Sequence, residues 1–253
     1  MAEPQDTESS LMEHLLELRT RLMRALMGLG LVLVVLLPFT SRIYNWLAEP
    51  LIERLPAGQT FLAVNPAGAF FAPVKLTFFV ALFFAAPWLL YQAWAFVAPG
   101  LYQREKRVAT PLLASAVALF YAGCAFAYFL VLPMVFNFLV KFKPDVIAIT
   151  PDASAYLDFV VVIFFAFGAS FELPVAVVIL ALLGWVTPAQ LKEARGYVLV
   201  GIFVLAAVIT PPDVISQLML AIPMYLLYEA GILAARWLVP AQADGAPPVS
   251  GRR

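Results

Sequence analysis

The chain has very few residues that support covalent or metal chemistry. Its 253 residues include one cysteine, Cys124, and one histidine, His14. A single cysteine excludes an internal disulfide framework and a cysteine-clustered metal site, and a single histidine leaves no second imidazole for a zinc or di-iron site. The sequence also lacks G-x-x-x-x-G-K-[S/T] and G-x-S-x-G motifs, which argues against a P-loop motor and a Ser–His hydrolase. We therefore predict a protein that is not an enzyme and that binds no cofactor and no metal.

Charge is equally scarce. Sixteen basic and sixteen acidic residues make up 13% of the chain and cancel to zero, whereas a soluble domain is about one quarter charged. A nucleic-acid partner is excluded because it requires a clustered basic excess. Hydrophobic residues reach 63% and the mean hydropathy is +0.91, which is more than one soluble core of this size can bury. The surface itself must be apolar, and the solvent it fits is a lipid bilayer.

Long apolar runs define the expected fold. Six runs cover residues 22–39, 74–98, 112–140, 159–183, 198–209 and 214–233. The first four are long enough to cross a hydrocarbon core of about 30 Å, whereas the fifth reaches only about 18 Å as a helix and polar residues interrupt the sixth. The prediction is an all-α polytopic membrane protein whose single domain, residues 1–237, has six transmembrane helices. Helices five and six are expected to be short, and the tail, residues 238–253, to be disordered.

Four prolines lie within these runs: Pro87, Pro133, Pro174 and Pro223. Each removes a backbone donor and tends to kink a helix, which favours a cupped, kinked bundle. The sixteen lysines and arginines divide eleven to five between the two sides of such a bundle. By the positive-inside rule, both termini are expected in the cytoplasm and the loop of residues 41–73 on the opposite side.

Two acidic residues lie among the bases of the predicted cytoplasmic face. Glu17 precedes the first run and stands four residues before Arg21, while Glu105 is the lone acid among three bases in the second connection. The simpler interpretations are an i,i+4 ion pair worth a few tenths of a kcal/mol and charge balance in a solvated loop. The functional interpretation is a pair of carboxylates that bind two guanidinium groups.

Polar residues also occur within or beside the later runs. Glu172 lies inside the fourth run, where a carboxylate costs about 2.5 kcal/mol or more unless it is hydrated, paired or protonated. Glu172 is therefore either a functional residue or a structural one that bonds to a neighbouring helix. Asp213 precedes the sixth run and is suited to cap that helix. Gln217, one turn further in, needs a hydrogen-bond partner, which another protein's helix can supply.

Four segments in the same order resemble the TatC family, the multispanning receptor subunit of the twin-arginine protein translocase. They are His14-Leu15-Leu16-Glu17-Leu18-Arg19-Thr20-Arg21, Phe96 to Glu105, Phe165 to Pro174, and Arg195 through Glu229 with its Thr210-Pro211-Pro212-Asp213 turn. The resemblance extends from about Leu11 to Trp237.

The resemblance implies a protein that transports folded proteins across the bacterial cytoplasmic (inner) membrane with the proton-motive force. It implies a multimeric complex with TatA- and TatB-type single-span subunits, and a site for the twin-arginine signal peptide of precursor proteins. The family's signal-peptide site falls on Glu17, Arg19, Phe96 and Glu105. Its partner-helix contacts fall on Thr210 and Gln217, its intramembrane glutamate on Glu172, and its periplasmic-loop proline on Pro50.

A gradient-driven permease for small solutes or ions, with Glu172 as proton relay, is the alternative. It fits the composition equally well, but it does not explain the paired cytoplasmic carboxylates or the short final hairpin, and no transporter-like internal repeat is evident. A purely structural scaffold is the third class. It would be favoured if helix contacts satisfied Glu172.

Overall fold

The computed structural model describes residues 5–52, 66–97, 106–135, 153–209 and 214–238. All regular structure in these residues is helical, which confirms the all-α prediction. Five described segments are long and apolar enough to cross a membrane: Met12–Trp46, Phe70–Val97, Thr110–Val135, Leu157–Leu182 and Gln217–Leu238. A shorter apolar helix covers Arg195–Val208. The chain forms two compact units, Met1–Ala169 and Ser170–Arg253, and each is described by itself.

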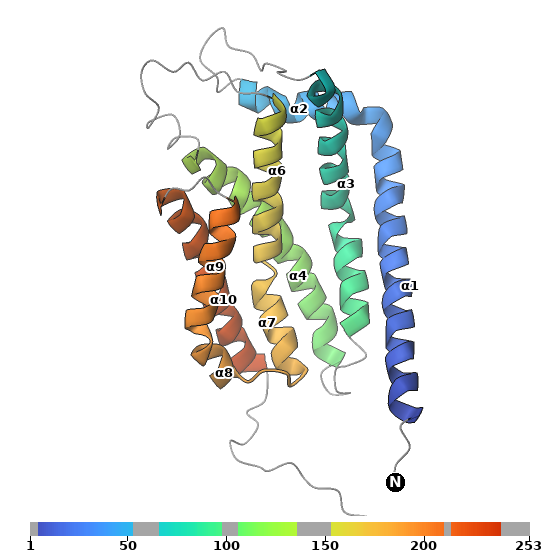
Figure 1. Cartoon of the computed structure of the whole chain (residues 1–253), viewed down its shortest axis with the longest axis vertical. Helices are drawn as coiled ribbons and strands as arrows, with labels where there is room; N and C mark the ends of the chain where they lie inside the picture. Colours follow the sequence, from blue (N-terminus) through green and yellow to red (C-terminus); the bar gives the residue numbers. More distant parts are fainter. Residues whose placement is uncertain (1–4, 53–65, 98–105, 136–152, 210–213, 239–253) are drawn as a thin grey trace, which may run out of the picture. The chain divides into compact units, whose positions relative to one another are not determined.

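The first unit begins with a long helix that turns into a crosswise one. α1 (Gln5–Leu36) is followed by a 3-10 turn, η1 (Leu37–Phe39), and by α2 (Thr40–Ile52), which runs across the direction of α1 (Figure 1). The sequence reasoning treated residues 41–73 as a loop, and this is wrong for α2 and for the start of α3. α2 is amphipathic: Ile43 and Tyr44 pack against the buried cluster described below, while Trp46 is exposed.

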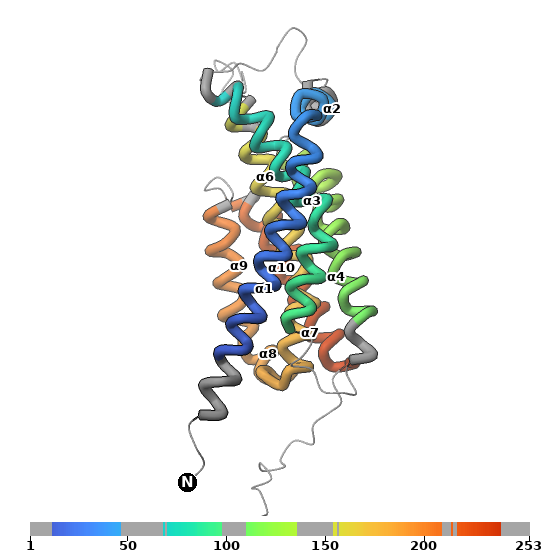
Figure 2. Tube along the Cα trace, turned by 90° about the vertical axis from the view of Figure 1, so that its right-hand side faces the viewer, coloured from blue at the N-terminus to red at the C-terminus, as the bar shows by residue number. Residues whose placement is uncertain are grey.

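α1 and α3 (Pro66–Val97) run side by side (Figures 1 and 2). The Trp88 indole N–H on α3 donates to the Arg24 carbonyl oxygen on α1 at 3.0 Å. The ring lies so close to Gly28 that a Cβ there would fall well inside van der Waals contact with it. Towards the other end of α3, the Thr77 hydroxyl lies 3.1 Å from that of Thr40. The Trp88 contact sets the register of α3 against α1, and the Thr77 contact ties α3 to the start of α2.

The rest of the first unit consists of one further membrane-length segment, which includes α4, and of α6. α4 (Lys106–Phe126) continues into a π-helical turn, η3 (Ala127–Val131), which ends two residues before Pro133. Pro133 has no N–H to donate to the helical pattern. α6 (Ala153–Ser170) packs near α3, where Lys75 and Asp158 form a 2.6 Å ion pair. Beside this pair lies a buried cluster of Ala72, Leu76, Leu157 and Val161.

The second unit contains α7 (Leu173–Leu182), α8 (Pro188–Glu193), α9 (Arg195–Ile209) and α10 (Val214–Leu238). The fourth apolar run is thus divided between α6 and α7 by a turn at Phe171 and Glu172, and Pro174 lies in the first turn of α7. α7 ends in a Schellman motif because Gly184 adopts φ 72° and accepts the left-handed conformation without strain. A reciprocal capping box of Thr187 and Gln190 starts α8.

The last two helices differ in length. α9 has 15 residues and is short, as expected, whereas α10 has 25 residues, about 37 Å of helix. The expectation that the sixth helix is also short is therefore wrong. Its polar residues do not end it because they find partners on the helix before it: Gln217 on the backbone of Phe203 and Glu229 on Arg195. Residues beyond Leu238, the predicted disordered tail, lie outside the described residues.

Candidate functional site

One end of the α1–α3 pair gathers an imidazole, a phenyl ring and an ion pair. The His14 ring on α1 stacks on the Phe96 ring on α3, with centroids 4.4 Å apart and planes 28° from parallel. Glu17, one turn further along α1, accepts from Arg21 at 3.2 Å, and their side chains are 32% and 24% exposed. The structure therefore places Glu17 and Phe96 at the same end of two adjacent helices, with the carboxylate still partly open to ligands.

The helical repeat of α1 explains this placement. Its partly buried positions include Glu17, Arg21, Ala25, Gly28 and Val32, a spacing of three to four residues that marks the stripe facing a neighbouring helix. Glu17 and Arg21 occupy one end of this stripe and neutralise each other.

Arg19 is exposed and lies about 200° around the helix from Glu17, so the structure does not bring the two together. Glu105, the second predicted carboxylate, lies outside the described residues.

α3 contains a buried polar residue that was not predicted from the sequence. Gln92 lies one turn from Trp88 and one turn from Phe96 and is only 3% exposed. Its Oε1 atom is buried, and no donor from the described residues reaches it. The sequence shows only an uncharged amide inside the apolar run 74–98. Its importance becomes visible only when its burial is known.

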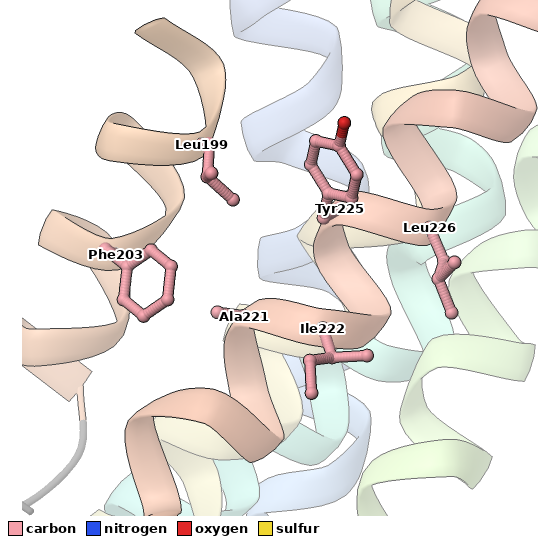
Figure 3. Close-up of a pocket in the computed structure, with 6 residues that line it drawn as sticks. All are labelled: Leu199, Phe203, Ala221, Ile222, Tyr225 and Leu226. Atoms are coloured by element: carbon pink, nitrogen blue, oxygen red, sulfur yellow. The ribbon is translucent and has the colours of Figure 1, made fainter. Parts of the chain in front are cut away.

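An apolar groove lies between α9 and α10 in the second unit. Its volume is about 200 Å³, and Leu199 and Phe203 of α9 face four residues of α10 across it (Figure 3). These four are Ala221, Ile222, Tyr225 and Leu226. Gln217 donates from Nε2 to the Phe203 carbonyl at 3.3 Å. This residue, predicted to contact a partner helix, therefore already has one hydrogen-bond partner within the chain.

Polar contacts tie the other end of the same hairpin. Arg195 at the start of α9 donates to Glu229 of α10 at 2.6 Å, and Tyr225 hydrogen-bonds to the same carboxylate. The Tyr228 hydroxyl donates to the buried Leu191 carbonyl at 2.6 Å. These bonds hold α8, α9 and α10 together and so keep the walls of the groove in place.

The remaining predicted site residues are only partly placed. Glu172 occupies the N-cap position of α7 without a side-chain capping bond, and its Oε1 atom is buried with no hydrogen-bond partner among the described residues. Pro50 lies in α2, but its side chain is outside the described residues, as are Thr210 and Asp213. The described part of the chain contains no group of three or more His, Cys, Asp or Glu residues arranged to hold a metal.

Comparison with known proteins decides the family. The family model of the Sec-independent protein translocase protein (TatC) matches residues 13–223. The chain belongs to the TatC family. TatC of Escherichia coli K12 is 47% identical over 93% of this chain and 91% of its own length, and TatC of Haemophilus influenzae is 47% identical over 95% and 94%. A crystal structure of the twin arginine translocase receptor TatC superposes with a TM-score of 0.78 at 35% identity, covering 89% of this chain and 99% of that one.

Membership of the TatC family confirms the resemblance seen in the sequence. The protein is a translocase component in a membrane, and it transports proteins rather than catalysing a reaction. The small-solute permease finds no support in these matches. The TatC crystal structures also support the helical membrane fold, with the count of six spans roughly met by five long apolar segments and the shorter α9.

Proposed function

We propose that this protein is the receptor of a twin-arginine translocase and binds the twin-arginine signal peptide at the end of α1 and α3 that holds Glu17. The observation that carries the proposal is the placement of the partly exposed Glu17 carboxylate beside the His14–Phe96 stack. Glu105 follows α3 in the sequence and supplies the second carboxylate, and Arg19 flanks the site on α1. Both termini are cytoplasmic and the membrane is the bacterial inner membrane, in accord with the division of basic residues.

The Glu17–Arg21 pair suits Glu17 to this task. Arg21 already presents a guanidinium to the carboxylate, so the site is complementary to the group it receives. An i,i+4 ion pair on a helix is worth only about 0.2–0.5 kcal/mol, and a peptide arginine that binds bidentately gains more than it displaces. Lysine lacks the planar fork of N–H donors, which gives a physical basis for preferring arginine.

The second unit offers a docking surface for TatA- and TatB-type single-span subunits. The groove between α9 and α10 is apolar and open, and its volume of about 200 Å³ accommodates large side chains of a partner helix. Gln217 lies near the start of α10, and Thr210 directly follows α9 in the sequence; both supply polar contacts to the partner. The partners complete a multimeric complex, and Glu172 provides a polar group within the membrane for a peptide or partner helix.

The short fifth helix and the driving force complete the proposal. The 15 residues of α9 reach about 22 Å, less than the hydrocarbon thickness, so the bilayer beside it thins and the barrier to a folded cargo falls. The proton-motive force supplies the work, in keeping with the missing nucleotide motif.

Site-specific photocrosslinking tests the receptor assignment. A photoreactive residue at Leu18, next to Glu17, is expected to crosslink to a precursor with a twin-arginine signal and not to the same precursor with two lysines. Glu17→Gln keeps the shape of the side chain and removes its charge, and it is expected to lower the crosslink yield about tenfold or more. A probe at the exposed Trp185 in the second unit is the matched control. A crosslink at Leu18 that survives replacement of both arginines would refute the proposed site.

A further inference from the structure

A buried hydrogen-bond acceptor without a donor lies near the proposed peptide site. Gln92 is 3% exposed, and its Oε1 atom has no donor among the described residues. Buried polar atoms are nearly always paired because an unpaired acceptor loses its bonds to water and gains nothing in exchange. The unpaired oxygen therefore calls for a donor that the described residues do not supply.

Two contacts between α1 and α3 give the level of Gln92 relative to Glu17. On α3, Gln92 lies one turn before Phe96, which stacks on His14, and one turn after Trp88, which donates to the Arg24 carbonyl. Between these two contact points, Glu17 and Arg21 are the half-buried residues of α1. By this register, Gln92 lies at the level of the Glu17–Arg21 pair, on the neighbouring helix.

The described neighbours do not satisfy Gln92. Arg21 is the half-buried charged donor at this level of α1, and its guanidinium contacts Glu17 Oε1 rather than the amide. A guanidinium carries five N–H donors in one plane, and a carboxylate takes at most two of them. A ligand arginine that replaces Arg21 on Glu17 therefore still has donors for a second acceptor across the helix interface.

We propose that Gln92 Oε1 accepts a hydrogen bond from an arginine of the bound twin-arginine peptide while that arginine is held by Glu17. Gln92 is then a specificity-determining residue. The planar guanidinium of arginine spreads its five donors so that it can bond the carboxylate and the amide together, whereas lysine carries its three donors on one nitrogen. This inference rests on the proposed signal-peptide site and adds to it an uncharged partner from α3.

Peptide binding to the full chain in nanodiscs tests the inference. The probes are a fluorescent peptide with two arginines and its twin-lysine counterpart, and the variants are wild type, Gln92→Leu and Thr77→Val. Gln92→Leu is expected to weaken the arginine peptide about tenfold and the lysine peptide less than about twofold, so that the preference for arginine shrinks. Thr77→Val removes a polar group from the same helix near its other end and is expected to leave both affinities unchanged.

Stability separates a ligand contact from a structural one. Because Oε1 is unpaired without ligand, Gln92→Leu is expected to leave the unfolding temperature unchanged or to raise it. If the variant unfolds at a lower temperature and weakens both peptides equally, Gln92 is structural and the inference is wrong. If wild type prefers arginine and Gln92→Leu keeps the full preference, the Gln92 contact is refuted while the receptor assignment stands. If wild type shows no preference for arginine, both fail.

Discussion

The close approach of Trp88 to Gly28 makes a single methyl group a sharp probe of the α1–α3 contact. In Gly28→Ala, the new Cβ meets the Trp88 ring well inside contact distance. Trp88 is 43% exposed, so its ring has room to swing away from α1, but it then releases the Arg24 carbonyl. The predicted outcome is a looser α1–α3 pair.

The expected cost follows from three contributions. The lost hydrogen bond costs about 0.5–1.5 kcal/mol, and the displaced ring costs about 1–3 kcal/mol as an overpacked contact. Alanine returns up to about 1 kcal/mol because it favours the helix over glycine. With the full gain from alanine these contributions sum to about 0.5–3.5 kcal/mol. Their midpoint, about 2 kcal/mol, lowers the unfolding temperature of a chain of this size by about 4–8 °C.

Cys124 provides the assay. It is the single cysteine of the chain, 5% exposed, and lies in α4 away from the substituted position. A thiol-reactive fluorophore added to the detergent-solubilised protein reports the temperature at which this thiol becomes accessible.

Gly30→Ala is the matched control because a Cβ at Gly30 meets nothing within 4 Å. Helix propensity alone then acts, and the unfolding temperature is expected to stay the same or rise by a few degrees. Equal shifts in the two variants would refute the argument, since the Trp88 contact distinguishes them.

Three further perturbations test the packing of both units. Gly231→Ala places a Cβ 2.9 Å from the Pro174 backbone, which cannot yield easily, and is expected to cost about 1–3 kcal/mol; Gly201→Ala, with nothing within 4 Å, is its control in the same thermal assay. Tyr228→Phe leaves the buried Leu191 carbonyl without its 2.6 Å donor and is expected to cost about 1–3 kcal/mol; an unchanged unfolding temperature would contradict this role. Asp158→Asn at the half-exposed Lys75 pair is expected to cost less than about 1 kcal/mol, and a larger loss, or one that salt does not reduce, would show that this ion pair is more than a surface contact.

The lengths of the apolar runs predicted most of the fold because a bilayer stabilises long apolar helices directly. It missed α2, whose apolar residues are spaced along one face and never form a long run. It also underestimated α10, because counting uninterrupted apolar residues treats Gln217 and Glu229 as breaks. Their partners, Phe203 and Arg195, lie on another helix. Such tertiary contacts cannot be predicted from the local sequence pattern.

The candidate site was predictable residue by residue but not as an arrangement. A charge beside an apolar run identified Glu17, and the i,i+4 rule identified its pairing with Arg21. The stack of His14 on Phe96 depends on the register of α1 against α3, which Gly28 and Trp88 set. Gln92 was not predicted for the same reason. An amide in a helix becomes a candidate binding residue only when the structure shows that it is buried and unpaired.

The sparse packing of α1 has a consequence for how the protein is made. No residue in the most apolar window of this segment is fully buried, and among the described residues α1 is covered only partly, along a half-buried stripe. Such a helix is stable in the bilayer before its neighbour exists, and it waits there until α3 has been synthesised and inserted. The Trp88–Arg24 bond and the His14–Phe96 stack then form late, by sideways docking of two complete helices. The proposed peptide site therefore forms only after both α1 and α3 have been inserted, since neither helix carries the site alone.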